Sequence, residues 1–167
     1  WLEAELQTDA RRLAAQPDVA AAVRRLPVPR GGKVIAIGDS VTTYRRSYAE
    51  LLRALLALCR PDDGIQYFNR AQSGFTSTHV RRSTYMQFVK EEPDLVLILL
   101  GGNDCERFGE PATGTLVSLG EYRENMEAIV TAFQRHTSAQ VVLLSPLPVI
   151  PEMVARVPDF ARSRVTW

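Results

Sequence analysis

The chain has 167 residues, enough for one domain with a sizeable core. Its formal net charge of +1 is too balanced for nucleic acid to be the main partner. Cys59 and Cys105 make no disulfide framework and have no metal-ligand spacing, and no apolar stretch approaches the roughly 20 residues of a transmembrane span. These features favour a cytoplasmic protein, while the start at Trp1 leaves a cleaved export signal open.

The first 32 residues are predicted to be a helical extension. Leu2 to Gln16 and Pro17 to Leu26 have the pattern of two short amphipathic helices, and Pro27 to Gly32 is typical of a linker. We therefore expect residues 1–32 to precede a domain formed by residues 33–167. The pattern leaves open whether the helices pack on that domain or contact a partner, and the oligomeric state is open too.

Strands and helices are predicted to alternate along the rest of the chain. Apolar runs predict strands at Val34 to Ile37, Ile65 to Asn69, Asp94 to Leu100 and Gln140 to Ser145. Helical patterns follow at about Ser47 to Leu58, Thr78 to Lys90, Tyr122 to His136 and, marginally, Glu152 to Arg162. This order is typical of βαβ units and predicts an α/β fold with a parallel sheet.

Three of the predicted strands end in polar residues that suit acyl chemistry. Gly38-Asp39-Ser40 follows the first strand, a loop with Gly74 follows the second, and Gly101-Gly102-Asn103-Asp104 follows the third. The carboxyl ends of parallel strands lie along one edge of the sheet, where ligands bind. A serine nucleophile there needs donors for the developing oxyanion, and the N–H groups of Ser40 and Gly74 with the amide of Asn103 would supply them.

These three blocks resemble the motifs of the SGNH hydrolases, also called GDSL esterases and lipases. Gly38-Asp39-Ser40-Val41-Thr42 is similar to the family's first block, Asn69 to Gly74 to its second, and Gly101 to Asp104 to its third. The resemblance covers roughly Lys33 to Pro148. It implies a three-layer α/β/α flavodoxin-like fold.

The resemblance also implies roles for particular residues. Ser40 would be the nucleophile, Gly74 and Asn103 would form the oxyanion hole, and Asp39, Asn69 and Gly102 would bind substrate. Family members cleave carboxylic esters of sugars, lipids or small alcohols, and a few are O-acyltransferases, so the expected partner is a small-molecule, glycan or lipid ester. No metal and no organic cofactor are expected.

The sequence departs from the family at the catalytic base. The family's fourth block, Asp-x-x-His, is absent, and we expect it beyond Trp167, in a C-terminal strand and helix that are missing here. The alternatives inside the chain are weak, because His79 has no evident orienting partner and His136 closes the helix on the opposite side of the sheet. Asp159 has Arg162 where the histidine would fall. Asp104 is expected to fix its loop through hydrogen bonds.

Two further hypotheses stay open at this stage. Without a base, the domain could bind an acyl or glycan ligand without turnover. Arginines near the loops could favour an anionic substrate or could be ordinary solvated side chains: Arg45, Arg46, Arg70, Arg81 and Arg82. A nucleotide-binding flavodoxin-like domain is weaker, since the first strand is followed by no glycine-rich phosphate motif.

Overall fold

A computed structural model describes residues 2–108, 114–163 and 165–166, and at its centre lies one parallel sheet. The strands are β1 (Lys33–Gly38), β2 (Gln66–Asn69), β3 (Leu95–Leu99) and β4 (Gln140–Leu144). Their order across the sheet is β2-β1-β3-β4, and each neighbouring pair is parallel. The predicted α/β fold is therefore confirmed.

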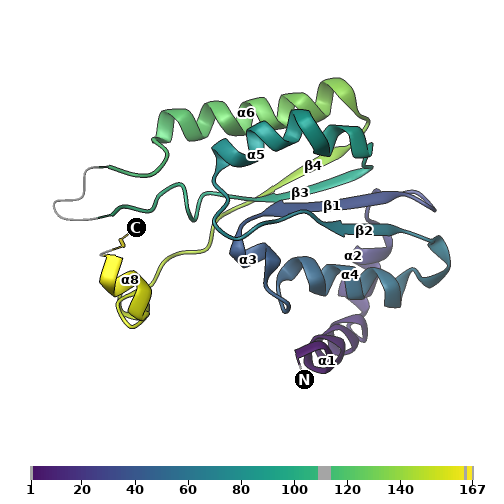
Figure 1. Cartoon of the computed structure of the whole chain (residues 1–167). Helices are drawn as coiled ribbons and strands as arrows, with labels where there is room; N and C mark the ends of the chain where they lie inside the picture. Colours follow the sequence, from purple (N-terminus) through teal and green to yellow (C-terminus); the bar gives the residue numbers. More distant parts are fainter. Residues whose placement is uncertain (1, 109–113, 164, 167) are drawn as a thin grey trace.

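Helices cover both faces of this sheet, which gives three layers (Figure 1). One face carries α5 (Ser77–Ser83) and α6 (Leu119–His136). The other carries α1 (Leu2–Ala14), α2 (Pro17–Arg24) and α4 (Tyr48–Cys59). Three shorter helices are α3 (Ser40–Thr43), α7 (Pro151–Val154) and α8 (Pro158–Ser163). Of these, α8 lies beyond the carboxyl ends of the strands (Figure 1).

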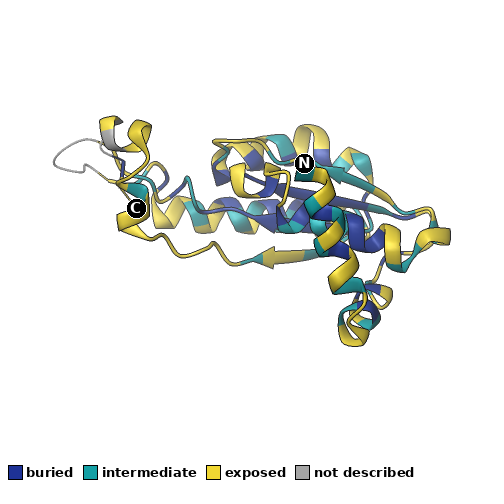
Figure 2. Cartoon of the chain, turned by 90° about the horizontal axis from the view of Figure 1, so that it is seen from below, coloured by how far each residue is buried: buried dark blue, intermediate teal, exposed yellow. Residues whose placement is uncertain are grey.

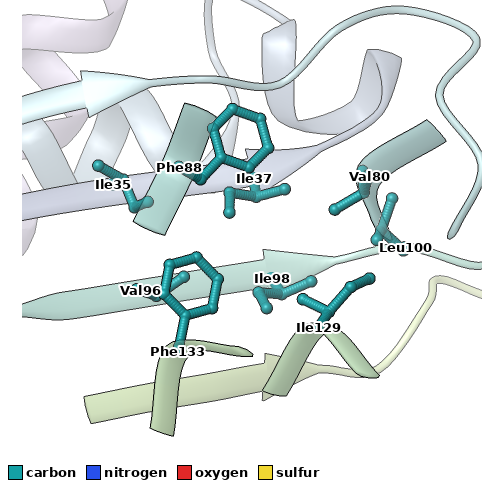
Figure 3. Packing of buried hydrophobic residues seen from close by; sticks show 9 residues of the cluster. All are labelled: Ile35, Ile37, Val80, Phe88, Val96, Ile98, Leu100, Ile129 and Phe133. Carbon is teal, nitrogen blue, oxygen red and sulfur yellow. The ribbon is translucent and has the colours of Figure 1, made fainter. Parts of the chain in front are cut away.

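The side chains of β1 and β3 alternate between two apolar cores, one on each side of the sheet. Ile35 and Ile37 point to the α5/α6 side, where they meet Val96, Ile98 and Phe133 (Figure 3). Their neighbours along the chain contribute to the core on the α4 side: Val34, Leu95 and Leu97. Both central strands are thus buried on both faces, which explains why their sequences show no polar alternation.

The N-terminal helices pack on the domain. Arg46, in the loop before α4, holds α1 through bonds of 2.9 Å to Glu5 and 2.9 Å to Asp9. Val23 of α2 and Val28 of the linker belong to the core on the α4 side. The described part of the extension, residues 2–32, thus contributes apolar surface to the core of the sheet and is in contact with the domain.

Two predicted helices are interrupted. The helix expected over Thr78 to Lys90 is α-helical only to Ser83, then continues as a π-turn (Thr84–Phe88) and a 3₁₀ turn (Val89–Glu91). The marginal helix expected over Glu152 to Arg162 is split into α7 and α8, because Pro158 cannot continue a helix and starts the next one instead.

Strand β4 forms an exposed edge of the sheet. Val142 and Leu143 are exposed, and Figure 2 shows this strand in yellow and teal beside the dark blue central strands. No helix among the described residues has the length and apolar character needed to cross a bilayer.

Candidate active site

The first block forms a tight turn that presents Ser40 at the end of β1. Asp39, not Ser40, caps the short helix α3: the N–H of Val41 donates to its Oδ1 at 2.9 Å. Ser40 is the first residue of that helix, and neither its N–H nor its hydroxyl is hydrogen-bonded within the described chain. Gly38 lets the helix close onto the strand, because a Cβ at this position would lie 2.2 Å from Thr42 Oγ1.

The second block is tied to the first. The N–H of Gln72 donates to the carbonyl of Gly38 at 3.1 Å. Asn69 Nδ2 donates to the carbonyl of Thr42 at 2.8 Å and to Glu50 Oε1 at 3.0 Å, while its Oδ1 accepts the N–H of Ala71 at 3.1 Å. Because its amide is used inside the protein, Asn69 positions this loop beneath α3.

Gly74 lies in the same loop with a φ of +81°, in the left-handed region that favours glycine. A Cβ there would meet nothing within 4 Å, so its backbone conformation is a reason for glycine independent of any substrate. Its N–H donates to no described residue.

The third block contacts both of the others. Asn103 Nδ2 donates to the carbonyl of Phe75, the residue after Gly74, at 2.8 Å. This bond uses one of the two amide hydrogens, and the second remains for a ligand. Gly102 lies against the first block, since a Cβ there would be 3.1 Å from the Asp39 carboxylate.

A buried polar network that sequence patterns did not reveal supports this third block. Both carboxylate oxygens of Asp104 accept the N–H of Ser77, at 2.9 and 3.1 Å, and Oδ1 also accepts the Ser77 hydroxyl. Asn125 of α6 donates to that hydroxyl at 3.0 Å. The sequence did contain one sign of this network. Asn125 lies four residues before Ile129 and eight before Phe133, so a polar residue interrupts the apolar stripe of its helix.

The first and third blocks face a cavity of about 390 Å³ at the carboxyl edge of the sheet. Its polar wall includes Asp39, Ser40, Gly102, Asn103 and Glu106. Its apolar lining comes largely from residues 146–160, among them Leu147, Ile150, Met153 and Phe160. Asn69 and Gly74 do not line it. The structure therefore brings Ser40 and Asn103 to one cavity, together with Glu106 and an apolar wall that the sequence motifs did not indicate.

Among the described residues that line the cavity, the charged side chains are carboxylates. Burial raises the pKa of Asp39, despite its hydrogen bond from Val41, and the nearby Asp104 adds to the rise. Burial, followed by the charge of Asp39, raises the pKa of Glu106. Both shifts reflect the cost of holding negative charge in a half-enclosed, like-charged site.

Several of the arginines considered for anion binding are already paired elsewhere. Arg46 binds Glu5 and Asp9, and the Arg70 guanidinium binds Glu91 at 2.9 Å. Arg81 donates to Asn125 Oδ1 at 3.1 Å. Arg45 and Arg82 are exposed, and neither lines the cavity. Within the described chain, the interpretation as ordinary surface and structural arginines is thus favoured over an anion site.

Neither histidine reaches the cavity wall. His79 closes the start of α5, where its Nδ1 accepts the N–H of Thr76 at 3.2 Å and its ring stacks on Phe75. His136 is exposed at the last position of α6, near the amino ends of the strands. In the described residues, no three histidine, cysteine, aspartate or glutamate side chains are grouped as metal ligands.

Comparison with known proteins agrees with this architecture. The model of the GDSL-like lipase/acylhydrolase family matches residues 36–166. No match was found among curated proteins.

Solved structures share the fold at low sequence identity. A variant of Axe2, an acetylxylan esterase from Geobacillus stearothermophilus, is 19% identical with a TM-score of 0.60, and the match covers 83% of this chain and 68% of that one. LAE5, an alpha/beta hydrolase enzyme from the metagenome of Lake Arreo, is 20% identical with a TM-score of 0.61, covering 83% and 70%. The acetyl xylan esterase AlAXEase is 21% identical with a TM-score of 0.56, covering 66% of this chain and 56% of that one.

Proposed function

Because the chain belongs to the GDSL-like lipase/acylhydrolase family, we propose that it cleaves carboxylic esters through an acyl-enzyme formed on Ser40. Ester hydrolysis in general follows from the family. The serine mechanism is supported chiefly by one observation: the unbonded hydroxyl of Ser40 and the amide of Asn103 line the same cavity.

In the proposed reaction, Ser40 Oγ attacks the ester carbonyl carbon while a base removes the hydroxyl proton. The carbonyl oxygen becomes an oxyanion, which the N–H of Ser40 and the second amide hydrogen of Asn103 would stabilise. The N–H of Gly74 is proposed as a third donor, although Gly74 is not among the residues that line the cavity, because this N–H donates to no described residue and the next residue, Phe75, is bonded to Asn103. Collapse of this intermediate expels the alcohol, which takes up the proton, and water then releases the acid from Ser40.

The cavity's two walls suggest where the parts of a substrate lie. The apolar wall formed by residues 146–160 suits an acyl group or the apolar face of a sugar ring. Axe2 and AlAXEase are acetylxylan esterases, and three catalytic mutants of Axe2 replace an aspartate, a histidine and a serine, one in each. We therefore propose small-molecule or glycan esters as the substrate class.

The base is proposed to come from residues that follow Trp167. His79 uses Nδ1 to cap α5, and His136 lies near the other edge of the sheet. An Asp-x-x-His block beyond Trp167 would supply both a base and the carboxylate that orients it. If an alcohol rather than water accepts the acyl group, the same site performs O-acyl transfer.

Substitution of the nucleophile tests the proposal. In the natural full-length protein, Ser40→Ala should abolish hydrolysis of 4-nitrophenyl acetate, whereas the matched change Ser138→Ala, at an exposed position after α6, should leave the rate unchanged. A serine-directed fluorophosphonate should add one adduct to the unsubstituted protein and none to Ser40→Ala. Turnover that survives in Ser40→Ala would reject the serine mechanism. Folded, unsubstituted protein with neither turnover nor labelling would favour a non-catalytic binding module.

A further inference from the structure

Glu106 is a carboxylate in the wall of the cavity with no partner in the described chain. Its backbone is fixed on both sides: its N–H donates to the carbonyl of Asn103 at 3.2 Å, and its carbonyl accepts the N–H of Leu116 at 2.9 Å. Its half-buried side chain makes no hydrogen bond or ion pair with a described residue. Glu106 therefore lines the same cavity as Ser40 and Asn103, with a fixed backbone and a carboxylate that accepts no hydrogen bond from a described residue.

No described cation offsets this charge at the cavity. The other charged lining residue is Asp39, which is also acidic, caps α3 and is only 3% exposed. Arg46 and Arg70 are bound to carboxylates on other surfaces. The described lining of the cavity therefore carries negative charge only. Of its two carboxylates, that of Glu106 is the more accessible.

A partly enclosed carboxylate without a donor is costly, and a ligand that brings positive charge relieves that cost. A ligand that brings negative charge increases it, and the low dielectric of a half-closed cavity strengthens both effects. We propose that Glu106 is a specificity-determining residue that makes this cavity favour esters bearing a positive charge over neutral ones and disfavour anionic ones. The inference rests on the proposed ester hydrolysis at this site, but it concerns charge selection and not the chemical step.

A pair of esters with the same shape isolates the charge. Acetylcholine and 3,3-dimethylbutyl acetate differ by one positive charge, so the ratio of their kcat/KM values measures the electrostatic preference. At low ionic strength, we expect the natural full-length protein to favour acetylcholine by roughly tenfold, the effect of one charge a few ångströms from a carboxylate in a partly solvated site. In Glu106→Gln the ratio should fall to about one, while Glu124→Gln, at an exposed site on α6, should keep it.

The failure of this inference differs from failure of the proposed function. If both esters are hydrolysed with equal kcat/KM, or if Glu106→Gln retains the preference, charge selection by Glu106 is wrong although the esterase assignment stands. If neither ester is hydrolysed, binding of choline and 3,3-dimethylbutan-1-ol, measured by NMR titration, decides the charge preference without catalysis, and the esterase assignment itself fails only if 4-nitrophenyl acetate is not hydrolysed either. Should Glu106→Gln fail to fold, Glu106→Ala is the second variant, with the same expected loss of preference.

Discussion

Removing the carboxylate of Asp104 tests whether the third block is held as the structure indicates. Asp104→Ala deletes the acceptor of the Ser77 N–H, bonded at 2.9 and 3.1 Å, and of the Ser77 hydroxyl. Both partners are out of contact with solvent: Asp104 is 3% exposed and Ser77 is 0% exposed. The substitution therefore leaves two buried donors without the acceptor that now satisfies them.

The expected loss follows from these contacts. A hydrogen bond to a charged group contributes about 1.5–3 kcal/mol, so two donors give about 3–6 kcal/mol before relaxation. Water entering the space left by the carboxylate would restore part of this, and we expect a net loss of about 3 kcal/mol. With a urea dependence of about 2 kcal/mol per molar, the unfolding midpoint should fall by about 1.5 M. Asp104→Asn keeps one acceptor and should lose about half as much.

Urea unfolding followed by far-UV circular dichroism measures the effect. The control is Asp62→Ala, an exposed aspartate whose side chain makes no hydrogen bond or ion pair to a described residue, which should stay within about 0.5 kcal/mol of the unsubstituted protein. A midpoint for Asp104→Ala within 0.5 M of the unsubstituted protein would show that the network contributes little. The role of Asp104 in fixing the third block would then be wrong.

Three other predictions address the site and its support. Asn103→Ala should reduce kcat/KM for 4-nitrophenyl acetate by roughly 150-fold, the equivalent of about 3 kcal/mol for one lost oxyanion donor; a change below threefold would contradict its proposed role. Gly38→Ala should destabilise the fold by about 2–3 kcal/mol, because the new methyl group would lie 2.2 Å from Thr42 Oγ1 and 2.8 Å from the Leu99 carbonyl oxygen. The control is Gly120→Ala, where a methyl group meets open space and should not destabilise the fold. The raised pKa of Glu106 means that the folded state binds more protons than the unfolded state between the two pKa values, so stability falls as pH rises through that window. Glu106→Gln should therefore raise the melting temperature at pH 7 by roughly 1–3 °C, with the gain vanishing at a pH below both values; an equal gain at low pH would contradict this origin.

The sheet was predictable because its signal is local. Val34 to Ile37 and Leu95 to Leu100 are uninterrupted apolar runs, and a strand covered by helices on both faces has that composition. The ends of these strands carry Ser40 and Asn103, and parallel pairing alone brings such ends to one edge. The meeting of these two residues at a cavity thus follows from pattern and topology.

The rest of the site depends on contacts between distant segments, which no local pattern encodes. Glu106 and Leu147 line one cavity although they lie forty-one positions apart. Arg46 can pair with Glu5 only because α1 packs against α4. The sequence does not show this packing, so it left open whether Arg46 binds an anionic substrate or is an ordinary surface arginine. The π-turn after Ser83 was not predictable either, since nothing in its composition ends the helical pattern there.

The three loops at the sheet edge bond to one another and to the framework before any ligand arrives. Gln72 is tied to Gly38, Asn103 to Phe75, and Asp104 to Ser77. A site assembled in this way is preorganised: its dipoles are aligned by folding, so little reorganisation remains for the moment when charge develops on a bound carbonyl. Under the proposed function, substitutions that break the bonds between the loops should then lower turnover as much as substitutions of the groups that touch the ester.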